Sequence, residues 1–152
     1  MSRPLTLLAL VWAPFLSIFV FASQGDTSAL HISSHVLALA LLIPASLLAW
    51  RMRPEAPTRA SRWILTILAV SVPVAVLGHA GELAVAVLRL AEDGWVNLDT
   101  ADIWQHGPHV TISNVTIPAM MLSMLLTVTL GVLSLRGRRS TPRTVEPSHP
   151  TI

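Results

Sequence analysis

The chain has 152 residues, of which 53% are apolar and 12% are charged, and its mean hydropathy is +0.65. Soluble domains carry about 25% charged residues, so this composition indicates a small membrane protein. No cysteine is present, which excludes disulfides, thiolate ligands and a haem attached through cysteines. The formal net charge is only +2, and all ten basic residues are arginines that lie mainly beside apolar segments, which gives no indication of a nucleic-acid partner.

Four apolar segments are each close to the ~20 residues that a helix needs to cross a bilayer. We expect an all-α integral membrane protein over residues 1–139, with four transmembrane helices in an up-down-up-down bundle, at about residues 4–22, 34–50, 63–86 and 110–135. Residues 140–152 are rich in proline, serine and threonine, which predicts a disordered cytoplasmic tail.

The first segment allows a second interpretation, because an early arginine followed by apolar residues also resembles a signal peptide cleaved after about residue 22. The apolar stretch is longer than the 7 to 15 residues usual in such peptides, and it contains Trp12 and Pro14. Cleavage would leave three spans and would not change the orientation of the later ones.

Arginine placement predicts the orientation. Nine of the ten arginines flank the expected spans on one side: Arg3, Arg51, Arg53, Arg59, Arg62, Arg136, Arg138, Arg139 and Arg143. The positive-inside rule places these segments, and therefore both termini, in the cytoplasm. We expect a multi-pass protein of the plasma (inner) membrane. Five of the six histidines then lie at the outer side: His31, His35, His79, His106 and His109.

One sizeable outer loop is expected at residues 92–108. Asn97 or Asp99 is a suitable N-cap for a short interfacial helix at about 101–105. Trp95 and Trp104 are the kind of aromatic residue that lies at the level of the lipid headgroups.

Helical rise predicts that His35 and His79 lie at the same depth. His35 is 16 residues before Arg51 and His79 is 17 residues after Arg62. At ~1.5 Å per residue, both are about 25 Å above the inner face, just inside the outer leaflet. Ionisable groups at this depth usually face the bundle interior and mark a functional site.

The residues around His79 also favour a site. Gly78 and Gly81 would let a neighbouring helix or a flat cofactor approach closely. Glu82 shares a face with His79 and could bind the same metal or orient the imidazole. Alternatively, Glu82 pairs with Arg89 or a loop residue among the headgroups, and His79 makes an ordinary core hydrogen bond.

His31 and His35 have the i, i+4 spacing of a chelating pair, if the second helix begins early enough. Otherwise His31 is a loop residue and His35 bonds locally. His106 and His109 flank the expected start of the fourth helix at Pro108, and Asp102 is four residues before His106, where it could fix the imidazole tautomer.

The outer part of the fourth segment is unusually polar, with four such residues: Thr111, Ser113, Asn114 and Thr116. These residues predict either a wet cavity that opens outward or a helix end among headgroups. Met120, Met121 and Met124 lie deeper than the histidines, and we interpret them as packing or lipid-facing residues rather than copper ligands.

Two kinds of cofactor fit this pattern. His35 and His79 could ligate a b-type haem in a slot lined by Gly78 and Gly81. A wider set could instead hold copper, zinc or iron: His31, His35, His79, Glu82, His109, and also His106 and Asp102. Either would serve electron transfer or metal handling rather than hydrolysis or group transfer, and no catalytic residue is predicted.

The alternative function is a non-catalytic accessory or assembly subunit of a membrane complex, with structural or pH-sensing histidines. Expected partners are the lipid bilayer and either other subunits or further copies of the chain. An ion transporter is disfavoured, because no ionisable residue lies between the inner arginines and the histidines of the second and third spans.

Overall fold

The computed structural model describes residues 2–23, 28–94 and 107–139. These ranges form four helices and contain no strand: α1 (Arg3–Ser23), α2 (Ser28–Met52), α3 (Arg59–Asp93) and α4 (Pro108–Arg139). Several predictions fall outside the described residues, namely the tail, the loop helix with its caps and tryptophans, and the candidate ligands Asp102 and His106. Each helix is longer than the span predicted for it.

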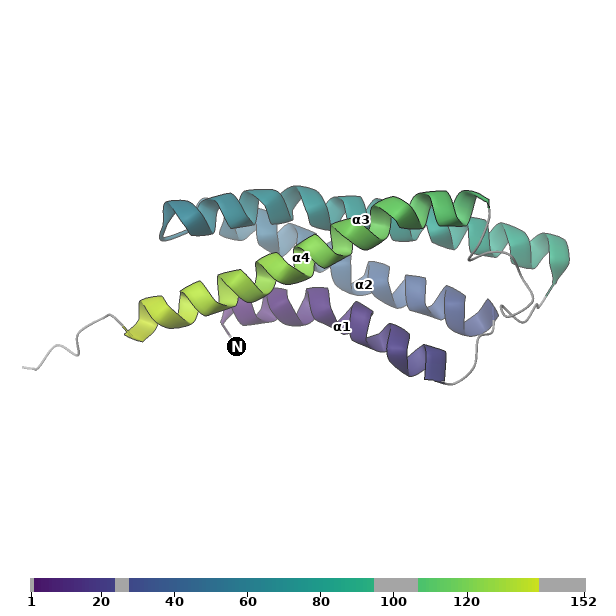
Figure 1. The fold of residues 1–152 in the computed structure, drawn as a ribbon, viewed down its shortest axis with the longest axis horizontal. Coiled ribbons are helices and arrows are strands. Elements are labelled where there is room, and N and C mark those ends of the chain that lie inside the picture. The colour runs from purple at the N-terminus through teal and green to yellow at the C-terminus, as the bar shows by residue number, and fades with distance from the viewer. Residues whose placement is uncertain (1, 24–27, 95–106, 140–152) are drawn as a thin grey trace, which may run out of the picture.

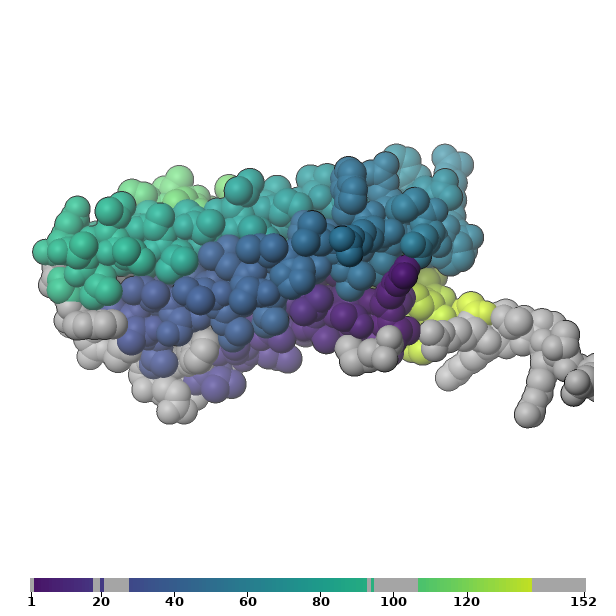
Figure 2. All heavy atoms as spheres, turned by 180° about the vertical axis from the view of Figure 1, so that it is seen from behind, coloured from purple at the N-terminus to yellow at the C-terminus, as the bar shows by residue number. Residues whose placement is uncertain are grey.

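The four helices pack in a ring that follows chain order. Each helix contacts the next one, and α1 closes the ring against α4. Figure 1 shows the helices running lengthwise, with α4 crossing at an angle and α3 extending beyond its neighbours at one end. The opposite view shows α3, α2 and α1 side by side across one face (Figure 2). This arrangement is an all-helical, four-helix bundle.

Three of these helices, α2, α3 and α4, are long and apolar enough to cross a membrane. The part of α1 in which every side chain is described, Arg3–Ser17, is apolar but shorter than such a span. Apolar side chains also cover the outside of the bundle, and Leu77 and Leu125 are 72% and 64% exposed. An apolar outer surface is what lipid requires, and a membrane protein is the conclusion that these helices support.

Small side chains bring the helices close together. Ala38, Leu42, Ala45 and Ala49 are buried along one face of α2, at the three- and four-residue spacing that places them on one side of a helix. Alanine at such positions permits close approach between backbones. Met120 and Met124 belong to the same buried core, as expected of packing residues, and Met121 is 62% exposed on the outside of the bundle.

Local signals determine where the helices begin and end. Thr58 caps α3 by accepting a hydrogen bond from the Ser61 backbone N–H at 3.0 Å. Gly94 and Gly107 have φ angles of 76° and 88°, which favour glycine, and they flank the segment between α3 and α4. Pro108 is the first residue of α4, as predicted, because proline suits the first helical turn.

Candidate metal centre

Three helices bring five ionisable side chains together inside the bundle. They lie where α2 and α4 begin and α3 approaches its end, at the opposite end from Arg51 and Arg62. Each is between 1% and 8% exposed: His31, His35, His79, Glu82 and His109. Burial of so many polar groups is costly unless they satisfy one another or bind a ligand.

Helix α2 begins at Ser28, so His31 lies on the helix rather than in the preceding loop. The two imidazoles of α2 are therefore one turn apart on one face, as the i, i+4 interpretation required. The Nε2 atoms of His35 and His109 each lie 3.0 Å from Nε2 of His31. Two imidazoles thus bring the same ring nitrogen next to that of His31, and the three residues form a group of possible metal ligands.

Hydrogen bonding alone does not account for this convergence. A neutral imidazole nitrogen carries either one hydrogen or one lone pair, directed in the plane of the ring. Nε2 of His31 can therefore form one well-directed hydrogen bond, with either His35 or His109, but not two. A cation accepts lone pairs from all three nitrogens at once, which is why converging imidazoles are typical of metal sites.

Glu82 lies beside this group. Its Oε2 atom is 3.6 Å from Nε2 of His109 and 3.8 Å from Nε2 of His35. Its Oε1 atom is buried and forms no hydrogen bond with any described residue. A Glu82–Arg89 pair is not what the structure shows, because the basic side chains within 4 Å of the carboxylate in the described ranges are the two histidines.

His79 contacts the cluster through His35. The Nδ1 atoms of the two rings are 3.0 Å apart, so these imidazoles meet from different helices, as the equal-depth argument predicted. His35 presents its other nitrogen, Nε2, to His31. Two groups of possible metal ligands therefore share His35, one with His31 and His109 and the other with His79 and Glu82.

Of the two neighbours expected beside these glycines, a helix or a flat cofactor, the structure shows a helix. A Cβ added at Gly78 would lie 2.1 Å from Oγ1 of Thr116, and one added at Gly81 would lie 3.2 Å from Cδ1 of Ile112. Both neighbours come from α4. The glycines bring α3 and α4 into contact and thereby hold His109 close to the other ligands.

The polar outer part of α4 does not require a wet cavity. The hydroxyls of Thr111, Ser113 and Thr116 donate to backbone carbonyls three or four residues earlier in the helix. Asn114 is exposed on the outside. Of these four residues, only Thr116 is buried, and it packs against Gly78.

The sequence analysis did not predict a polar contact that links α3 and α4 further along the bundle from the histidines. Ser71 and Ser123 form a buried hydroxyl–hydroxyl hydrogen bond of 2.8 Å between these helices. His109, Thr116 and Ser123 are seven residues apart, which is close to two helical turns and places them on one face of α4. That spacing was the available signal for the face of α4 that points inward.

Comparison of the chain with protein-family models, with curated proteins and with solved structures found no match.

Proposed function

We propose that this chain is a small integral membrane protein that binds a single transition-metal ion in the buried histidine cluster and serves in metal handling. The observation that carries the proposal is the convergence of the Nε2 atoms of His31, His35 and His109. We infer that these three imidazoles are the ligands. Glu82 supplies negative charge or a fourth ligand atom.

The spacing of the nitrogens supports an ion of ordinary size. Zinc–imidazole bonds of 2.0–2.1 Å in tetrahedral geometry place ligand atoms about 3.3 Å apart. The 3.0 Å separations of Nε2 of His35 and of His109 from Nε2 of His31, and the 3.6 and 3.8 Å separations to Glu82, lie on either side of that value. Imidazole donors favour zinc, copper(II), iron or nickel.

His79 fits best as the residue that orients His35. When Nε2 of His35 binds an ion, its Nδ1 carries the hydrogen and donates it to Nδ1 of His79, 3.0 Å away. Such a bond fixes the tautomer of the ligand. We therefore assign His79 a positioning role, and Glu82 the role of balancing the positive charge of the ion.

A single ion fits better than a haem. Bis-histidine haem ligation needs a porphyrin between the two axial nitrogens, whereas the Nδ1 atoms of His35 and His79 are at hydrogen-bonding distance. Thr116 and Ile112 cover the glycines that would have lined the slot. A haem would also leave the close approach of His31 and His109 unexplained.

The distribution of arginines supports an orientation with the metal centre on the outer side of the plasma membrane. The described arginines of the α2–α3 connection lie at one end of the bundle, and the histidines lie at the other. With both termini on the cytoplasmic side, as proposed from the positive-inside rule, all four helices cross the membrane. The centre then exchanges metal with the external space.

The direct test is metal analysis of the purified protein. We expect the full chain, extracted in detergent from cells grown in metal-replete medium, to carry about one equivalent of zinc, copper, iron or nickel. The visible spectrum should lack a Soret band. Removal by a chelator followed by titration with Zn²⁺ or Cu²⁺ should restore one equivalent per chain.

Two results would contradict this proposal. A Soret band that is lost in both His35→Ala and His79→Ala would establish haem instead. A colourless preparation that contains no metal and fails to bind added Zn²⁺, Cu²⁺, Fe²⁺ or Ni²⁺ would favour an accessory subunit with structural histidines.

A further inference from the structure

The arginine end of the bundle contains two adjoining pockets that the metal centre does not use. The first has a volume of about 870 Å³ and is lined by Arg51, Arg53 and Arg62, together with Arg3 and Glu55. The second has a volume of about 670 Å³. Arg3, Met52 and Glu55 line both pockets, so the two are neighbours.

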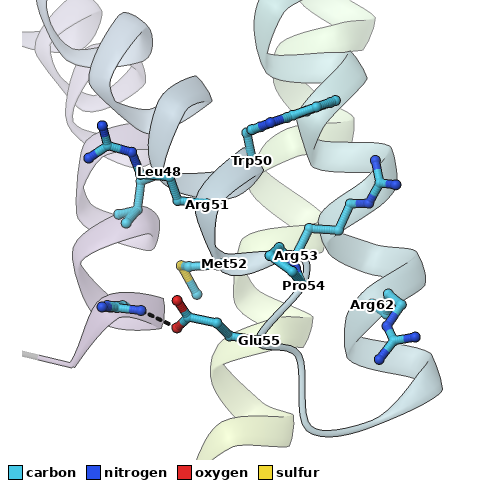
Figure 3. Close-up of a pocket in the computed structure, with 9 residues that line it drawn as sticks. Leu48, Trp50, Arg51, Met52, Arg53, Pro54, Glu55 and Arg62 are labelled. Atoms are coloured by element: carbon cyan, nitrogen blue, oxygen red, sulfur yellow. Dashed lines mark hydrogen bonds and ion pairs between the residues drawn. The ribbon is translucent and has the colours of Figure 1, made fainter.

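Positive charge dominates the first pocket. Glu55 is its single acidic residue and forms an ion pair with Arg3. Arg51, Arg53 and Arg62 then remain without an acidic partner in the described part of the chain. Their side chains lie around the α2–α3 connection, with Arg53 and Arg62 on one side of it and Arg51 on the other (Figure 3). Guanidinium groups in such a setting bind phosphate oxygens through paired hydrogen bonds.

An aromatic side chain helps to order this pocket. The Arg53 guanidinium carbon lies 5.3 Å from the centre of the Trp50 ring, which is a cation–π contact. Trp50 is 62% exposed, at the end of a membrane-spanning helix where tryptophan meets lipid headgroups. The stacked arginine therefore lies at the level of lipid phosphates.

The second pocket has a different lining, which identifies the kind of ligand. Leu65, Leu130 and Leu133 form its apolar wall, between the beginning of α3 and the end of α4. A free phosphate ion has no apolar part that could pack against these leucines. A molecule with a negatively charged phosphate and an acyl chain uses both pockets at once.

We propose that this end of the bundle binds an anionic phospholipid, with its headgroup phosphate on the side of Arg53 and Arg62 and part of one acyl chain against the leucines of the second pocket. Basic pockets between transmembrane helices are suited to anionic headgroups on the cytoplasmic side. The proposal is independent of the metal centre, which lies at the other end.

The test is native mass spectrometry of the full chain in detergent, with added phosphatidylglycerol and phosphatidylethanolamine that have identical acyl chains. We expect selective retention of phosphatidylglycerol. Arg53→Gln and Arg62→Gln should each reduce that selectivity by about fivefold. The matched control is Arg59→Gln, which removes the same charge from the same end but lines neither pocket.

A second pair of variants tests the apolar pocket without a change in charge. Leu133→Trp should fill it and reduce retention of phosphatidylglycerol, whereas Leu135→Trp should not, because Leu135 is 53% exposed and lines neither pocket. Metal content and the unfolding temperature, measured on each variant, show that the bundle remains folded.

Three results would overturn the proposal. Equal retention of the two lipids would show that there is no anionic site. A loss in Arg59→Gln as large as in Arg53→Gln would show that diffuse surface charge is responsible. Displacement of the lipid by millimolar inorganic phosphate, with no effect of Leu133→Trp, would show a phosphate site without lipid recognition.

Discussion

His31 and His109 face each other across the interior of the bundle with 3.0 Å between their Nε2 atoms, although 78 residues separate them in the chain. They come from α2 and α4, which are not neighbours in the ring of helices. A contact between opposite helices lies at the centre of a four-helix bundle, where facing side chains build metal and cofactor sites.

Loss of any one of the three converging imidazoles should abolish tight metal binding. We expect His31→Ala, His35→Ala and His109→Ala each to weaken Zn²⁺ or Cu²⁺ binding by more than the roughly 10- to 100-fold that loss of an outer-shell partner costs. The measurement is competition with a calibrated chelator. Asn114→Ala is the control, because Asn114 is an exposed residue of the same helix as His109. Unchanged affinity in all three variants would remove His31, His35 and His109 as ligands.

His79 should respond to substitution as a positioning residue. An asparagine side chain places an acceptor oxygen near the position of Nδ1, so His79→Asn should keep the bond from His35 and retain affinity within a few-fold. His79→Leu removes the acceptor and should weaken binding by about 10- to 100-fold. Equal and complete loss in both variants would instead make His79 a direct ligand.

Glu82→Gln should change stability and metal affinity in opposite directions. The substitution preserves shape and removes a buried negative charge, so the metal-free protein should unfold at the same temperature or a higher one. Binding of a divalent ion should weaken, because the charge that offsets the ion is gone. Thermal unfolding with and without metal measures both effects. A lower unfolding temperature without metal, at unchanged affinity, would assign Glu82 a structural role.

Gly78→Ala should separate α3 from α4. The new methyl group would meet the Thr116 side chain at 2.1 Å, and such overpacking costs about 1–3 kcal/mol of unfolding free energy. Metal affinity should fall as well, because α4 carries His109. The matched control is Gly131→Ala, where the nearest atom, Cδ1 of Leu8, lies at 3.8 Å. Partial recovery in Gly78→Ala/Thr116→Ala would confirm the contact, and equal stability of the two single variants would contradict it.

Orientation in the membrane can be tested on a background that contains no cysteine. Ala60 and Ala91 are exposed residues near opposite ends of α3. With protoplasts and a membrane-impermeant maleimide, Ala91→Cys should be labelled, and Ala60→Cys should be labelled only after permeabilisation. The reverse pattern would place the metal centre on the cytoplasmic side.

The depth of a residue along its helix was easier to predict from the sequence than the direction in which its side chain points around the helix axis. The helical rise, counted from Arg51 and Arg62, predicted that His35 and His79 lie at the same depth, and their rings are in contact. Rotation was not predictable in the same way, because helices that are apolar on every side carry little signal about which face is inside. The contacts of His31 with His109 and of Gly78 with Thr116 depend on that rotation.

The positions at which the helices begin and end were also predicted less well than their existence. Hydropathy marks the apolar part of a helix, and the polar turns beyond it remain helical when caps and neighbours support them. α2 therefore begins at Ser28, six residues before the predicted span, and α3 continues to Asp93. The earlier start of α2 is what places His31 on the same face as His35.

The assignment of ligands to helices has a consequence for how the protein is made. The first helix supplies no ligand, and His109 lies on the last one. During synthesis the pair on α2 is complete long before α4 leaves the ribosome, so the three-imidazole group does not exist until the final helix has been inserted. If the cluster binds an ion as proposed, metallation follows the synthesis of α4, and a nascent chain that stalls before α4 lacks His109 as a ligand.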